Sequence, residues 1–220
     1  MKTPGVYIVE KDAFPNSAVP VATSIPAFIG YTKNTCYQGK SLHNKAIKIH
    51  SFPEFLEYFG HEPPSIKFDI EKGPADAPDF TYGDDNAAYT LKPTGPIYRM
   101  YSALRFFYQN GGGTCYIISV GDYSGPLELS ALKSGIAVLE KEIEPSLLVI
   151  PEAIELIAPT HTELNDKYAA AYEIQSDMIN HCGTRGNRMA ILDIPRPNIL
   201  KTQKSRWQYP MQHPGGVQSW

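Results

Sequence analysis

Three acidic residues are the side chains that the sequence places best for a chemical role. Asp122, Glu152 and Asp193 each stand at or just beyond the end of a short apolar run that predicts a buried strand. Ligands of open α/β sheets bind beyond the carboxyl ends of the parallel strands, so three carboxylates there could hold a metal ion or serve a hydrolase. No histidine, lysine or serine completes a recognisable constellation around them. This favours the plainer interpretation, in which they solvate loops and cap the helices that follow.

Two glycine-containing runs and two histidines are weaker candidates. Gly111-Gly112-Gly113 follows a predicted helix and precedes a predicted strand, as does the run at 183–186, whereas a phosphate-binding loop follows a strand and opens a helix. A helix cap and turn is therefore favoured for both runs. His161 and His181 are too far apart along the chain to chelate a metal from one helical turn. We expect no catalytic, cofactor-binding or metal-binding residue.

Composition narrows the class of protein. The 220 residues carry a net charge of −3 and are 42% hydrophobic, which suits one sizeable core and gives no basic field for nucleic acid. Three cysteines with wide gaps (Cys36, Cys115 and Cys182) are typical of free thiols in a reducing compartment. The sequence has neither a signal-peptide pattern at its start nor a run near the ~20 apolar residues of a membrane span. We expect a chain made and folded in the cytoplasm, without membrane insertion.

The first third of the chain predicts an extended arm, a buried strand and a short helix. Val6–Val9 is β-prone, and residues 14–27 hold three prolines among valine and alanine, which predicts an arm over residues 1–24. The apolar run 27–32 predicts a buried strand. Ser51 and Glu54 form a capping box for a helix that ends at Gly60. Four residues lie on one face of that helix: Phe52, Phe55, Leu56 and Phe59.

The next segment, residues 61–96, carries six prolines and three glycines with weak periodicity. This composition predicts an irregular lobe or a long loop, and loops of this length in compact domains are usually functional or mobile. Residues 196–220 are polar and rich in proline, glutamine and glycine, so we expect an irregular C-terminal segment.

Between these two segments, helical stripes alternate with short apolar strands. The predicted strands are 115–120, 147–150 and 189–194, and the third helix begins at a capping box formed by Thr160 and Glu163 and closes at Gly183. This alternation implies an α/β body of residues 25–60 and 97–195, three-layer-like, with a largely parallel sheet and helices on its faces. The three helical stripes are Ile97, Met100, Tyr101, Leu104 and Tyr108; Leu129, Leu132, Ile136 and Leu139; and Leu164, Tyr168, Tyr172 and Ile179.

Four segments in order resemble the contractile tail sheath family of phage tails, R-type bacteriocins and extracellular contractile injection systems. The opening residues 3–7 (TPGVY) with 20–30 (PVATSIPAFIG) are similar to the start of these proteins, and residues 51–60 (SFPEFLEYFG) to the short helix of the family. Residues 101–116 (YSALRFFYQNGGGTCY) resemble its most recognisable segment, and residues 147–153 (LLVIPEA) a further strand. The motif residues are Leu104, Phe107, Asn110, Gly111, Gly112, Cys115 and Tyr116.

This resemblance implies a structural subunit, not an enzyme. Such a subunit polymerises around an inner tube and contracts, in a virion or released phage tail-like particle. Its partners are further copies of itself or close paralogues, the tube protein, and baseplate and cap proteins. In the family an N-terminal arm adds a strand to a neighbouring subunit; the corresponding arm residues are Pro4, Gly5, Val6, Tyr7, Ile8 and Val9.

The C-terminal segment departs from the family, because residues 196–220 do not resemble the region that packs against the inner tube. Two alternatives therefore stay open. One is a Rossmann-like enzyme that uses the strand-end acids, and the other is a non-contractile tail adaptor or cap built on a truncated sheath-like fold.

Overall fold

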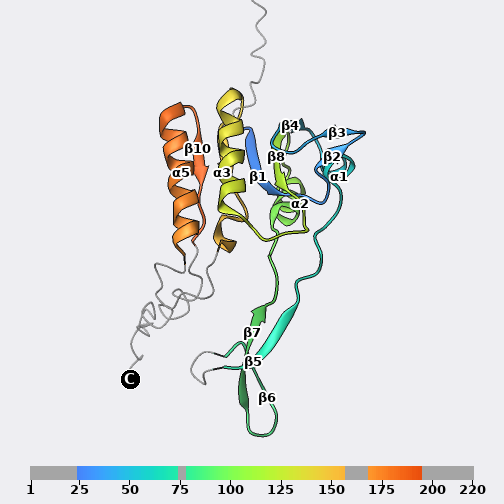
Figure 1. Cartoon of the computed structure of the whole chain (residues 1–220), viewed down its shortest axis with the longest axis vertical. Helices are drawn as coiled ribbons and strands as arrows, with labels where there is room; N and C mark the ends of the chain where they lie inside the picture. The colour runs from blue at the N-terminus through green and yellow to red at the C-terminus, as the bar shows by residue number, and fades with distance from the viewer. Residues whose placement is uncertain (1–23, 74–77, 157–167, 195–220) are drawn as a thin grey trace, which may run out of the picture.

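The computed structural model describes residues 24–73, 78–156 and 168–194 (Figure 1). The predicted arm up to residue 23, the capping box at Thr160 and Glu163, and the segment 196–220 lie outside the described residues.

A five-stranded, largely parallel sheet forms the centre of the body, in the order β10-β9-β1-β8-β4. β1 pairs in parallel with β8 and β9, and β9 pairs in parallel with β10, which confirms the predicted, largely parallel sheet. β4 runs antiparallel to β8 and was not predicted, because its four residues carry no clear alternation. The strands are β1 (Pro26–Tyr31), β4 (Ala46–Ile49), β8 (Cys115–Gly121), β9 (Leu147–Val149) and β10 (Met189–Ile191).

Helices cover both faces of this sheet. α1 (Phe52–Phe59) and α2 (Met100–Gln109) pack on one face, and α3 (Leu129–Val138) and α5 (Ala169–Arg185) lie side by side on the other (Figure 1). The connection from β1 to β8 crosses the sheet in one direction, and those from β8 to β9 and from β9 to β10 cross it in the other. Because parallel crossovers are right-handed, opposite directions place their helices on opposite faces. Two short 3-10 helices, η1 (Leu139–Lys141) and η2 (Ala153–Glu155), and a two-stranded antiparallel sheet of β2 (Cys36–Tyr37) and β3 (Lys40–Ser41) complete the described body.

The alternating side chains of β1 divide the core into two clusters. Ala27 and Ile29 belong to the cluster beneath α3 and α5, whereas Phe28 belongs to the cluster beneath α1 and α2. All six residues of β1 are buried, as expected for a central parallel strand covered on both faces. The sheet is therefore the middle layer of three.

The caps of α1 confirm the predicted start and end of that helix. The Ser51 hydroxyl accepts a hydrogen bond from the Glu54 amide at 3.3 Å, and the Glu54 carboxylate accepts one from the His50 amide at 2.8 Å. Gly60 follows with φ +84°, in the left-handed region that favours glycine. Phe55 and Phe59 are fully buried, so the predicted apolar face is also confirmed.

The predicted apolar face and end of α5 were wrong. Tyr172 and Ile179 are 36% and 52% exposed, and the helix continues past Gly183 to Arg185, where Gly186 caps it at φ +69°. The helix carries bulky residues on more than one side, so spacing alone did not select the buried one. The buried residues of α5 are Ala171, Ile174, Met178, His181 and Cys182.

The prediction of an irregular lobe at 61–96 was also wrong. This segment contains a three-stranded antiparallel sheet, β5 (Phe68–Lys72), β6 (Phe80–Tyr82) and β7 (Ala87–Pro93), in the order β5-β7-β6. The glycines and prolines that the structure describes in this segment lie in turns, in connecting segments or at a strand end; Gly83, for example, has φ +88° in the β6–β7 turn. They therefore delimit the strands and do not break them. We call this sheet the lobe, and Figure 1 shows it extending away from the body.

Candidate functional site

The motif residues form the junction between α2 and β8. Leu104 and Cys115 are fully buried, and the Phe107 ring packs edge-on against Phe28 with ring centroids 5.5 Å apart. The Cys115 thiol lies 3.3 Å from the Tyr108 hydroxyl, and burial raises its pKa to about 11. A thiol with such a pKa is inert at neutral pH, so Cys115 serves packing.

The glycines of the motif shape the turn after α2. Asn110 caps the helix, and its side-chain amide donates to the Phe106 carbonyl at 2.7 Å. Gly111 has φ +83°, and a Cβ at Gly112 would clash with the Phe107 ring. The predicted helix cap and turn is confirmed, and the glycines serve backbone geometry.

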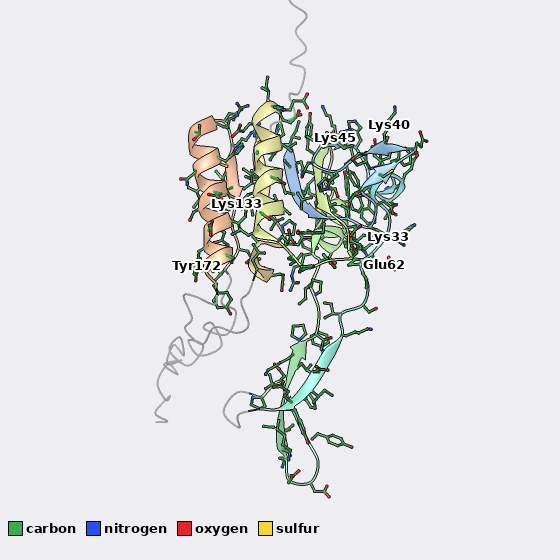
Figure 2. All side chains as sticks on the ribbon, in the orientation of Figure 1. Lys33, Lys40, Lys45, Glu62, Lys133 and Tyr172 are labelled. Carbon is green, nitrogen blue, oxygen red and sulfur yellow. The ribbon has the colours of Figure 1, made fainter. Side chains whose placement is uncertain are left out.

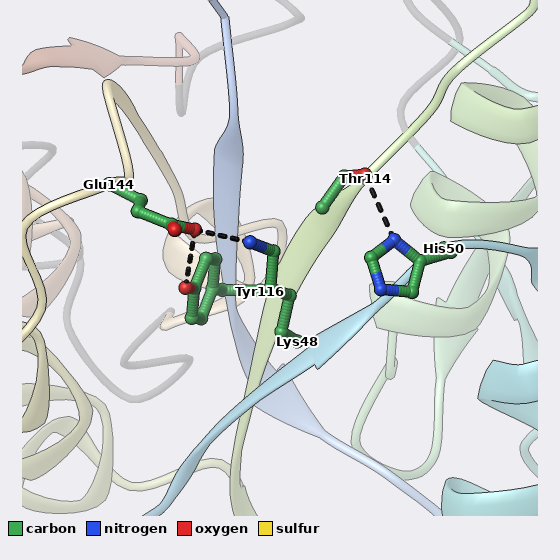
Figure 3. A network of polar contacts seen from close by, with 5 residues as sticks. All are labelled: Lys48, His50, Thr114, Tyr116 and Glu144. Atoms are coloured by element: carbon green, nitrogen blue, oxygen red, sulfur yellow. Dashed lines mark hydrogen bonds and ion pairs between the residues drawn. The ribbon is translucent and has the colours of Figure 1, made fainter. Parts of the chain in front are cut away.

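Tyr116 joins the sheet to the segment before β9 (Figure 3). Its hydroxyl donates to the Glu144 carboxylate at 2.7 Å, and the Lys48 ammonium of β4 donates to the same carboxylate at 2.5 Å. These bonds lower the pKa of Glu144, with the bond from Lys48 as the largest cause. Nearby, the His50 ring and the Thr114 hydroxyl are 3.0 Å apart. Through Tyr116, the motif thus also joins β4 and β8 to the segment that precedes β9.

An apolar groove of about 610 Å³ lies beside this junction, on the α2 face of the sheet. Leu147, Val149 and Ile191 point into it, because strand register places them on one face of β9 and β10. Met189 and Ile191 are 67% and 50% exposed. The remaining lining residues come from the start of β1 and from α2: Ser24, Pro26, Phe28, Ala103, Phe106, Phe107, Asn110, Gly111 and Gly112.

Glu152 lies where the sequence placed it, but its side chain is turned into the protein. It follows β9 beside the end of β1, the point at which the strand order reverses and where ligands of this architecture bind. The side chain is fully buried, and its carboxylate accepts hydrogen bonds from the backbone amides of Arg99 at 3.1 Å and Met100 at 2.8 Å. Burial raises its pKa to about 7, against the effect of these two bonds. Glu152 therefore caps the first turn of α2.

Two polar atoms in this region are buried without a hydrogen-bond partner among the described residues. They are the Oε2 atom of Glu152 and the hydroxyl of Tyr123. Burial raises the pKa of Tyr123, and the charge of Glu152 adds to the shift. The Tyr98 ring stacks obliquely on Tyr123, with centroids 4.7 Å apart.

The other two strand-end acids have ordinary roles. The Asp122 carboxylate accepts a hydrogen bond from the Ser124 amide at 2.9 Å and another from the Ser124 hydroxyl, which lowers the pKa of Asp122. Asp193 is exposed, and its carboxylate accepts from the Ile194 amide at 2.8 Å. No hydrogen bond or ion pair joins the three acids within the part of the chain that the structure describes. Asp122 therefore stabilises the turn after β8 and caps no helix, since α3 begins at Leu129 after Glu128. Glu152 caps α2, which precedes it in the chain, so the predicted capping of the helices that follow was wrong at both residues.

Arg188 is a structurally important residue that the sequence did not reveal. Its guanidinium is 9% exposed and donates to the carbonyls of Leu139 at 2.7 Å, Pro145 at 3.0 Å and Glu142. It also approaches the His181 ring at 2.9 Å. These contacts join the turn before β10 to the segment before β9. The partners lie more than 40 residues apart in the sequence, so a local sequence pattern could not predict the contacts.

The arm residues Pro4 to Val9 lie outside the described residues. Over the described ranges, no group of three or more histidine, cysteine, aspartate or glutamate side chains could hold a metal ion. None of the helices described is long and apolar enough to cross a membrane. No protein-family model matches the chain, and no curated protein matches it.

Proposed function

We propose that this chain is a structural subunit of a contractile tail sheath, assembled in the cytoplasm as part of a virion or phage tail-like particle. The single observation that supports this most is the open edge of the sheet at β10. This strand pairs with β9 alone among the described strands, and its Met189 and Ile191 side chains are half to two-thirds exposed. An exposed apolar edge strand is a site at which an extended segment of another subunit can add.

The contacts at the α2–β8 junction support the proposal, because a sheath subunit needs a body that keeps its shape. The α2–β8 junction is fixed by a helix cap, by two glycines and by the bonds of Tyr116 and Lys48 to Glu144. In the proposal this body moves as a unit during contraction, while the arm of residues 1–24 keeps each subunit joined to its neighbour. Contraction then releases free energy as new contacts between subunits form, without a nucleotide.

The test is electron microscopy of the particle purified from its source, and of the recombinant chain with and without residues 1–12. We expect striated tubes from the full chain, and a soluble body that forms no tubes from the deletion. Normal tubes from the deletion would refute the role of the arm. Rings without tubes from the full chain would favour the non-contractile adaptor.

An enzyme is the second candidate, because Glu152 has a raised pKa at a position where α/β enzymes bind ligands. Its carboxylate is fully buried and caps α2, which favours a structural role. A nucleotide or metal ion that copurifies with the chain in stoichiometric amount would reverse this preference.

A further inference from the structure

The lobe presents one apolar face and one polar face. Residues directly opposite each other in an antiparallel pair share a face, and residues alternate along each strand. Phe80 pairs with Tyr89, and their rings stack with centroids 5.4 Å apart, which fixes the side on which they lie. The polar face carries Asp69, Glu71, Thr81, Thr90 and Lys92, with an ion pair between Glu71 and Lys92. The opposite face, which we call the lobe face, is formed by Phe68, Ile70, Phe80, Tyr82, Ala87, Tyr89, Leu91 and Pro93, with Lys72 at its β5 edge.

The lobe face is exposed to an unusual degree for a sheet surface of this composition. Phe68, Ile70 and Tyr82 are 48%, 63% and 74% exposed. A sheet with one apolar face ordinarily buries that face against a second layer. The body does not supply this layer, because the lobe extends away from it (Figures 1 and 2).

We propose that the second layer is the lobe face of another copy of this chain, packed sheet on sheet around a two-fold axis. Area supports this. Five side chains of the lobe face leave roughly 500 Å² uncovered per copy, taking about 200 Å² as the surface of one fully exposed side chain. They are Phe68, Ile70, Phe80, Tyr82 and Leu91. Two copies would bury about 1,000 Å² in total, which is the lower limit for a specific interface.

Charge supports the same partner and sets the orientation. The β6–β7 turn at the tip of the lobe carries Asp84 and Asp85, and the base carries Lys67 next to Phe68. All three side chains are exposed. An antiparallel two-fold arrangement brings the acidic tip of each copy to the basic base of the other. In such an isologous contact each attraction occurs twice.

Charge also argues against an anionic membrane or a nucleic acid as the occupant. Across the described lobe, the acidic residues Asp69, Glu71, Asp79, Asp84 and Asp85 outnumber the three lysines Lys67, Lys72 and Lys92. A surface of this sign is repelled by phosphate-rich partners.

This lobe pairing does not depend on the proposed sheath function, since it concerns the soluble full chain. The test is sedimentation velocity of the full chain over a concentration series, compared with two variants. Ile70→Glu places a charge between the apolar side chains of the lobe face, on strand β5, and should weaken pairing at least ten-fold. The matched control, Thr81→Glu, places the same charge on the opposite face and should pair as the unchanged chain does. Ile70→Thr, which keeps a β-branched side chain in the strand, should give an intermediate loss without unfolding the lobe.

A charge-reversal pair tests the orientation and the identity of the partner. Asp85→Lys and Lys67→Glu should each weaken pairing. The chain that carries both changes should regain most of it, because a second copy then also carries both reversed charges and its tip and base again attract those of the first copy. A full chain that stays monomeric at every concentration would refute the proposal. So would association that Ile70→Glu leaves unchanged or that Thr81→Glu reduces equally. Absence of tubes in the microscope, by contrast, would count against the sheath and not against this pairing.

Discussion

The carboxylate of Glu152 occupies the space in which a side chain at Gly30 would lie. A Cβ atom built on Gly30 would clash with the Oε2 atom of Glu152. The same carboxylate holds the amides of Arg99 and Met100 at the start of α2. Because Gly30 has no side chain, the Glu152 side chain, which follows β9, can reach the start of α2 and cap that helix.

Gly30→Ala is expected to destabilise the protein by about 2 kcal/mol or more, because the added methyl group displaces a buried, hydrogen-bonded carboxylate. Urea unfolding would measure the change. Gly125→Ala is the control, since a Cβ there meets open space, and should stay within about 0.5 kcal/mol. Combining Gly30→Ala with Glu152→Ala should cost less than the sum of the two single changes. Strict additivity would show that the two residues do not share this space.

Glu152 should also make stability depend on pH. Burial raises its pKa from an ordinary value of 4.5 to about 7, so between these values the folded state binds more protons than the unfolded state. The contribution of Glu152 is therefore fully present below pH 4.5 and is lost as pH rises through 7, by at most about 1.4 kcal/mol per pH unit.

Glu152→Gln should remove the part of the pH dependence of stability that Glu152 causes. The glutamine side-chain oxygen can still accept from the Met100 amide, but glutamine does not ionise. The measurement is urea unfolding of both proteins from pH 4.5 to 8, with the difference between the two curves as the readout. A constant difference across this range would contradict the assignment.

The glycine pair after α2 offers a matched comparison. Gly112→Ala should destabilise the protein by about 1–3 kcal/mol, because the Cβ overlaps the Phe107 ring, which itself packs on Phe28. Gly113→Ala meets open space and should be nearly neutral. Thermal unfolding of both variants would check this, and equal melting temperatures would show that Phe107 can move aside at no cost.

Arg188→Lys should destabilise the protein by about 1–3 kcal/mol although charge is conserved. A lysine ammonium cannot reach the carbonyls of Leu139, Glu142 and Pro145 at once, so buried acceptors lose their donors. The control is Arg105→Lys on the exposed side of α2. Chemical denaturation would measure the free energy of unfolding of both variants. Equal values for Arg188→Lys and Arg105→Lys would mean that water replaces the Arg188 guanidinium as donor to the three carbonyls.

The body could be predicted from the sequence because its signals are local. The apolar runs at β1 and β8 are short and buried on both faces, so their apolar residues predict both the strand and its burial. The apolar run at β9 predicts the strand, although Leu147 and Val149 are only half-buried. The caps of α1 were equally local, since Ser51 and Glu54 lie within one helical turn of each other.

The remaining features depend on contacts between distant segments or on competing signals. The lobe strands do alternate, as in Phe68-Asp69-Ile70-Glu71, but the proline and glycine content around them favoured an irregular segment. The position of Glu152 beyond a strand end was predictable. Its burial was not, because it depends on Gly30 and on the start of α2, both far away in the sequence.

The base of the lobe has a consequence for protein engineering. The two chain segments that enter and leave the lobe are joined at its base by a hydrogen bond from the Thr94 amide to the Lys67 carbonyl, 3.0 Å long. Because the entering and leaving segments are held together at the base of the lobe, another unit whose two ends lie equally close can be inserted between them. We therefore expect that residues 68–93 can be replaced by another closed unit, such as a reporter domain or a binding module, while the body still folds.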